Sequence, residues 1–181
     1  SVNTDYFLYR DFQSRNIMVK DSEIYFIDYQ GGRKGALQYD VASLLYDAKA
    51  EIPNPLREEL LNYYLDKLES DYGLSRVEFM KSYYAFVLIR IMQAMGAYGF
   101  RGLFEKKVQL IKSILPARKN LKYLLENGKL DFDIPHLHEV FGNIITSDEF
   151  NIYEDPILPN EKLSVTITSF SYKREIPIDL A

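Results

Sequence analysis

The sequence contains no cysteine, so neither a disulfide nor a thiolate metal site can form. It has no tryptophan and only two histidines among its 181 residues. No apolar run reaches the roughly 18–20 residues that a membrane-spanning helix needs. The opening residues also lack the basic and apolar regions of a signal peptide. These absences favour a cytoplasmic protein without a membrane partner.

A basic excess is also missing, because 22 lysines and arginines face 26 acidic residues and the net charge is −4. A nucleic acid is therefore not expected as the main partner. What is abundant is apolar and aromatic side chains: 47% of the residues are hydrophobic, and 15 tyrosines and 11 phenylalanines are present. This composition predicts a packed globular domain.

The apolar spacing predicts a mixed fold that is mainly helical. Two β-prone runs at 16–19 and 24–27, separated by a polar turn at 20–23, predict a hairpin. Glycines at 31, 32 and 35 predict a loop after it. Helical spacing then predicts helices over 39–49, 56–70, 75–98, 103–114, 116–127 and 135–145, with Ser75 and Glu78 forming a capping box. The fold class is therefore α+β, mainly α.

Three polar residues around the hairpin suggest phosphoryl-transfer chemistry. Asp11 and Asn16 stand at the two ends of a tight loop, and Asp28 follows the second β-prone run. Transfer from ATP needs a carboxylate near the acceptor hydroxyl and oxygen ligands for Mg²⁺. Asp11, Asn16 and Asp28 fit that need in type and order. The alternative is that Asp11 and Asn16 only form a turn.

The same residues resemble known kinase motifs. Protein kinases carry H-R-D-x-x-x-x-N followed by D-F-G. The local text is more similar to the aminoglycoside and choline phosphotransferase family, with H-G-D-x-x-x-x-N, then I-D-W/Y/F, then D-P-x-x-D-L-A. The corresponding segments are Tyr9-Arg10-Asp11 to Asn16, Ile27-Asp28-Tyr29, and Gln38-Tyr39-Asp40-Val41-Ala42. One departure is Tyr9, which stands where the family has histidine.

The resemblance implies a role for each matched residue and the fold of a kinase-like C-terminal lobe whose hairpin carries the catalytic and metal loops. Asp11 would be the catalytic base or hydroxyl-orienting group. Asn16 and Asp28 would bind Mg²⁺, with ATP as the phosphate donor. Asp40 would brace the catalytic loop through Arg10. The alternative for Asp40 is an N-cap of the next helix.

A closer resemblance concerns the acceptor. The stretch YRDFQSRNIMV is similar to the HRDFMPRNLMV style of cell-wall-recycling kinases, which phosphorylate N-acetylmuramate and N-acetylglucosamine at the anomeric hydroxyl. Residues 90–100 also resemble the long helix of that group, and the likeness covers about residues 5–127. It implies a sugar or amino-sugar acceptor, with Gln13 and Arg90 near the acceptor or phosphate. Alternatively, Gln13 is a solvated loop residue and Arg90 pairs with an acidic neighbour.

The end of the chain changes character. We expect the kinase-like lobe over 1–145, a linker over 146–161, and the truncated start of a second domain over 162–181. Residues 162–177 resemble the opening strand of the C-terminal domain of the RNase-adapter (RapZ-type) family, which would make Lys173 and Arg174 the first basic residues of an anion site. The alternative is an ordinary edge strand with a solvated basic end.

Kinase-like enzymes also need an N-terminal lobe with a glycine-bearing loop and a strand lysine. We expect this lobe to be absent here and to be the missing partner from the same protein, so that the 181 residues alone are inactive. Two functions follow. The first is an ATP-dependent phosphotransferase with an alcohol group as acceptor. The second is a non-catalytic kinase-like regulatory module that passes a ligand signal to the RNase-adapter-like segment.

Overall fold

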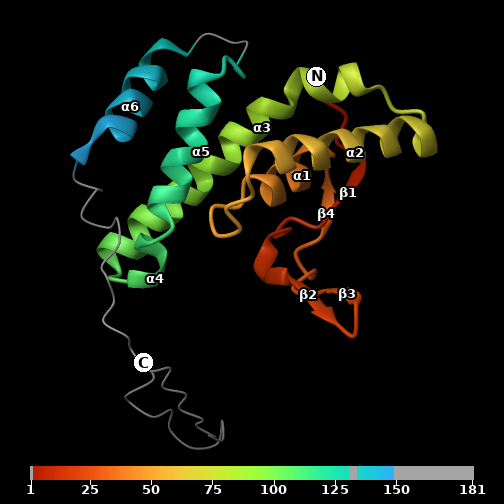
Figure 1. Cartoon of the computed structure of the whole chain (residues 1–181), viewed down its shortest axis with the longest axis horizontal. Coiled ribbons are helices and arrows are strands. Elements are labelled where there is room, and N and C mark those ends of the chain that lie inside the picture. Colours follow the sequence, from red (N-terminus) through yellow and green to blue (C-terminus); the bar gives the residue numbers. More distant parts are fainter. Residues whose placement is uncertain (1, 131–133, 149–181) are drawn as a thin grey trace, which may run out of the picture.

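The computed structural model describes residues 2–130 and 134–148, which are mostly helical and carry two small antiparallel sheets (Figure 1). The α+β class, mainly α, is confirmed. The strands are β1 (Tyr6–Leu8), β2 (Ile17–Lys20), β3 (Glu23–Phe26) and β4 (Arg33–Gly35). The helices are α1 (Gln38–Leu45), α2 (Asn54–Tyr72), α3 (Arg76–Ala97), α4 (Val108–Ile111), α5 (Ile114–Glu126) and α6 (Pro135–Thr146). A 3-10 turn, η1 (Ser14–Asn16), precedes β2, and a π-helical segment, η2 (Tyr98–Phe104), follows α3.

The predicted hairpin is β2–β3, whose register runs from Ile17 opposite Phe26 to Lys20 opposite Glu23. Asp21 and Ser22 form the two-residue turn, and both have positive φ (51° and 65°). That conformation matches the twist of the strands, which is why short polar residues occupy it. Figure 1 shows the hairpin standing away from the helices.

The predicted glycine loop is wrong for residues 33–35, which form β4 and pair antiparallel with β1. Gly35 lies against Leu8, and a Cβ at Gly35 would stand 2.1 Å from Leu8 Cδ1. Three-residue strands carry too little pattern to be recognised from sequence. The pairing positions the chain that leads into the Asp11 loop.

Helix α1 stops at Leu45, four residues before the predicted end. The cause is Asp47, whose carboxylate accepts a hydrogen bond from the Lys49 backbone N–H at 3.1 Å. Short polar side chains of this kind compete with helical carbonyls for backbone donors. The chain then turns towards α2.

Helices α2 and α3 are joined by a tight connection. Gly73 has φ +64° at the end of α2, and its backbone N–H donates to the Glu69 carbonyl at 3.1 Å. Helices commonly end at a glycine in this left-handed conformation. Ser75 Oγ accepts the Glu78 N–H at 3.3 Å, so the predicted cap is confirmed in that direction.

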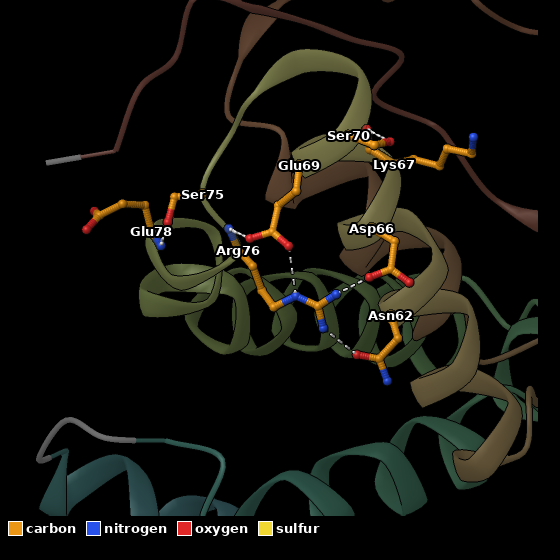
Figure 2. A network of polar contacts seen from close by, with 8 residues as sticks. All are labelled: Asn62, Asp66, Lys67, Glu69, Ser70, Ser75, Arg76 and Glu78. Carbon is orange, nitrogen blue, oxygen red and sulfur yellow. Dashed lines mark hydrogen bonds and ion pairs between the residues drawn. The ribbon is translucent and has the colours of Figure 1, made fainter.

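Figure 2 shows how Arg76 fastens α3 to α2. Its guanidinium contacts Asp66, Glu69 (3.4 Å) and Asn62 (3.1 Å), all on α2. These contacts are partly exposed, so they fix the geometry of the corner more than they add stability.

The core lies along α3, which packs against α1, α2 and α5. Tyr83 and Val87 are fully buried, whereas Ile89 and Met92 on the same helix are exposed. The largest fully buried side chains are Tyr83, Leu65, Leu121, Leu124 and Val87. Helix α6 packs on α5 at the opposite end of the molecule from the β2–β3 hairpin (Figure 1).

The predicted helix at 103–114 is wrong. Helix α3 continues directly into η2, and only the four residues of α4 are α-helical before α5. A Cβ at Gly102 would approach Ile111 Cγ1 to 3.0 Å, so the small glycine lets α4 fold back against η2. Helices α5 and α6 agree with the prediction to within about two residues.

The predicted linker and second domain fall almost entirely outside the described residues. No helix in the part of the chain that the structure describes is long and apolar enough to cross a membrane.

Candidate active site

The Asp11–Asn16 loop is closed by its own hydrogen bonds. The Gln13 N–H bonds the Asp11 carbonyl and the Asn16 N–H bonds the Gln13 carbonyl, each at 2.9 Å. The Asn16 side-chain Nδ2 also donates to the Asp11 carbonyl, at 2.8 Å. Asn16 is only 5% exposed, whereas Asp11 is exposed. The buried amide therefore fixes the backbone of an accessible carboxylate.

Asp28 is tied to the same loop through its neighbour Ile27. The Ile27 N–H donates to the Asn16 carbonyl at 3.1 Å, which continues the β2–β3 ladder by one step. The Ile27 carbonyl accepts a hydrogen bond from the Tyr9 hydroxyl. Asp28 itself adopts φ +70° and accepts a bond from Gln30. The structure thus brings together all three residues that the motif singled out.

Tyr9 is the residue that stands where the family has histidine. Its ring packs against Phe12 and Phe26, with centroid separations of 5.5 and 6.3 Å. Burial, and then the charge of Asp28, raise the pKa of the Tyr9 hydroxyl. The hydroxyl therefore stays protonated at neutral pH and donates to the Ile27 carbonyl. Tyr9 thus links the Asp11 loop to the segment that carries Asp28.

Asp40 contacts the loop from α1. Its Oδ2 accepts the Tyr9 N–H at 2.6 Å and its Oδ1 accepts the Arg10 N–H at 2.9 Å. The expected link through Arg10 therefore runs to the backbone N–H. The N-cap alternative is wrong, since Asp40 is the third residue of α1 and Leu37 precedes the helix.

Arg10 has φ +79°, a left-handed conformation that costs a non-glycine residue of the order of 1 kcal/mol. The two Asp40 bonds hold it there. Burial raises the pKa of the Asp40 carboxyl, against the lowering effects of its two backbone hydrogen bonds and of the Arg90 charge.

Asp47 is a residue that sequence reasoning missed. It is buried, and its Oδ2 accepts hydrogen bonds from the Ser14 N–H at 3.0 Å and the Ser14 hydroxyl at 2.6 Å. Asp40 therefore holds the start of the loop and Asp47 holds its far end. Asp47 lies beyond the end of α1, so helical spacing gave no signal for it, and its partner Ser14 is 33 residues away in sequence.

The two predicted contact residues lie on different sides of this arrangement. Arg90 Nη1 donates to the Tyr39 hydroxyl (2.7 Å) and to Gln93 Oε1 (2.8 Å), and its guanidinium stands 4.8 Å from the Tyr39 ring centre. The hydrogen-bond partners of Arg90 are thus neutral. Its positive charge acts to lower the pKa of Asp40. Gln13 is half-buried and shapes the loop through its backbone.

A divalent cation fits the donor set. The Asn16 side-chain amide donates its N–H to the Asp11 carbonyl. Its Oδ1 accepts no hydrogen bond from any described residue. Asp28 adds an exposed carboxylate. Within residues 2–130 and 134–148 no group of three or more histidine or acidic side chains could hold a metal. One amide and one carboxylate suit Mg²⁺, which is usually bound by few protein ligands together with phosphate and water oxygens.

Comparison with known families adds a sequence match over the same region. Residues 5–79 match the family model described as "Phosphotransferase enzyme family". The matched region is less than half of the chain, but it contains the Asp11 loop, Asp28, Asp40 and Asp47. The match supports the aminoglycoside/choline phosphotransferase family and suggests a kinase-like phosphotransferase, a class that generally uses ATP and Mg²⁺. No curated protein matches the chain.

Proposed function

We propose that the chain carries the catalytic and metal-binding loops of an ATP-dependent phosphotransferase that phosphorylates a hydroxyl of a sugar or amino sugar. The observation that carries the proposal is the joint fixation of Asp11, Asn16 and Asp28. Asn16 bonds the Asp11 carbonyl, and Ile27 bonds Asn16 immediately before Asp28. The hairpin register accounts for the Ile27–Asn16 bond, and the bond from the Tyr9 hydroxyl to the Ile27 carbonyl adds a second link between the loop and the segment that carries Asp28.

In this proposal Asp11 orients the acceptor hydroxyl and takes its proton. The residue is exposed, and its carboxylate makes no hydrogen bond or ion pair with any described residue, so it is available to a substrate. Asn16 Oδ1 and the Asp28 carboxylate would hold Mg²⁺. When bound, the ion would neutralise charge on the transferred phosphate. Asp40 and Asp47 keep Asp11 aligned during this proton transfer, because positioning supplies a large part of such catalysis.

The acceptor is proposed from sequence likeness and from the position of Arg90. The likeness of residues 9–19 to cell-wall-recycling sugar kinases supports a sugar or amino-sugar hydroxyl. Arg90 lies within electrostatic reach of Asp40 and carries a buried Nε without a partner. We assign Arg90 and Gln13 as contacts for the acceptor or the transferred phosphate.

The test is Mg²⁺-dependent ATP consumption by the protein in its natural full length. The acceptors are N-acetylmuramate, N-acetylglucosamine, choline, homoserine and aminoglycosides, and Asp11→Asn is the matched variant. We expect turnover with one sugar acceptor and a loss of about 10²-fold or more in the variant. Turnover that survives in Asp11→Asn would refute the role of Asp11.

A complete absence of turnover, with Mg-ATP still bound, would favour the second function. The chain would then act as a kinase-like regulatory module, coupled to the segment that resembles an RNase adapter. An unchanged cellular function in Asp11→Asn would point the same way.

A further inference from the structure

Arg57 on α2 is a buried cation surrounded by neutral groups. It is 5% exposed. Its Nη1 donates to Asn54 Oδ1 at 3.0 Å, and its Nη2 donates to the Ile52 carbonyl at 3.1 Å and to Asn120 Oδ1 at 2.9 Å. Its guanidinium carbon lies 4.0 Å from the centre of the Tyr46 ring. The arrangement anchors the side chain firmly but supplies no negative charge.

The guanidinium also has an unused donor. Arg57 Nε is buried and has no hydrogen-bond partner, and among the described residues no carboxylate pairs with Arg57. A buried charge is normally paired, since withdrawal from water costs several kcal/mol per ion. The chain therefore keeps a positive charge at a place where its own residues do not neutralise it.

A polar cavity of about 210 Å³ lies beside this cation, between the start of α2 and the first turns of α5. Arg57, Asn54 and Asn120 border it together with exposed Lys119. Exposed Glu51 borders it as well, so two cations face one carboxylate. Helix α2 begins at this cavity, and a helix N-terminus adds partial positive charge.

We propose that this cavity binds a small anion through a carboxylate or phosphate group, with Arg57 and Lys119 supplying the positive charge. The cavity is separate from the Asp11 site, and the proposal does not depend on the proposed phosphotransferase activity. Ala48, which borders the cavity, directly follows Asp47, the residue that holds Ser14. An occupied cavity would therefore also steady the far end of the Asp11 loop.

Titration of the 181-residue chain with sodium phosphate, and separately with sodium acetate, tests the proposal. Ionic strength is held constant with sodium chloride, and binding is followed by calorimetry and by the Arg57 Nε–H resonance. We expect saturable binding and a shifted Arg57 resonance with at least one probe. Saturation by phosphate alone would assign a phosphate ligand, and saturation by both would assign a carboxylate-tolerant site.

Charge variants at exposed positions test the site without disturbing the core. Lys119→Glu should weaken binding about fivefold or more, and Glu51→Gln should tighten it about two- to fivefold, from the worth of exposed charge pairs. Lys112→Glu, on an exposed lysine outside the cavity, is the matched control and should change binding less than twofold. Equal, unsaturable effects in all four proteins would mean a general salt effect and would overturn the proposal.

Discussion

The clearest test of how the Asp11 loop is held is the substitution Asp40→Asn. The wild-type carboxylate offers one oxygen to each of two backbone donors, Oδ2 to Tyr9 and Oδ1 to Arg10. Asparagine has a single oxygen, so its NH₂ group must face one of these N–H groups. One backbone donor then loses its partner. The change is nearly isosteric, so packing is not the variable.

Two effects of opposite sign determine how much Asp40→Asn changes the free energy of unfolding. An unsatisfied N–H in a partly buried site costs about 1–3 kcal/mol, and the remaining bond is no longer charge-assisted. Removal of a charge that burial disfavours, as the raised pKa of Asp40 shows, offsets part of that loss. We expect the lost hydrogen bond to be the larger effect, with a net decrease of about 1–2 kcal/mol in the free energy of unfolding. This corresponds to a melting temperature about 2–8 °C lower for a chain of this size.

The assay is urea unfolding followed by circular dichroism, together with hydrogen exchange of the Tyr9 and Arg10 amides. Both amides should exchange faster in Asp40→Asn, because Arg10 can then leave its left-handed conformation. Asp71→Asn, on an exposed helical aspartate, is the control and should change stability by less than about 0.5 kcal/mol. Unchanged stability with both amides still protected would refute the bracing role of Asp40.

Three further predictions follow from the same contacts. Tyr9→Phe removes the bond to the Ile27 carbonyl and should lower stability by about 1 kcal/mol; Mg²⁺ affinity should fall with it, and unchanged affinity would contradict the link. Gly35→Ala forces a methyl group against buried Leu8 and should lower the free energy of unfolding by about 1–3 kcal/mol in urea; unchanged stability would show that Leu8 moves aside without cost. Because the folded state raises the pKa of Asp40, the wild type should gain stability relative to Asp40→Asn as pH falls from neutral towards about 3.9; an opposite slope in paired unfolding curves would show that the shift has the other sign.

The sequence predicted the parts of this structure that depend on local chemistry. The β2–β3 hairpin follows from two β-prone runs around a polar turn, and α5 and α6 follow from apolar periodicity and prolines near their first turns. The α3–η2–α4 region was not predictable in the same way. Its departure from a regular helix depends on the approach of Gly102 to Ile111, which are nine residues apart and meet only when the chain folds back.

The candidate site shows the same difference between residues that local chemistry identifies and residues whose partners are distant in sequence. Asp11, Asn16 and Asp28 were predicted because a metal-dependent transfer needs those residue types in that order, and their catalytic and metal-binding roles stay predictions. Asp47 could not be predicted, because its function is to bond Ser14, which is 33 residues away in sequence. The link between Asp40 and Arg10 was expected, but the sequence did not indicate that it runs through the Arg10 backbone N–H, since backbone donors carry no sequence signal.

Under the proposed function, the Asp11 loop must satisfy two demands that conflict. Its carboxylate must stay accessible to substrate, so Asp11 cannot be held by contacts of its own side chain. The structure meets both demands by placing every restraint on the backbone around Asp11. Asn16 holds its carbonyl, Asp40 holds the two N–H groups before it, and Asp47 holds Ser14 beyond it. Rigidity at Asp11 is therefore a property of three buried or half-buried polar side chains, each of which can be removed without touching the reactive group.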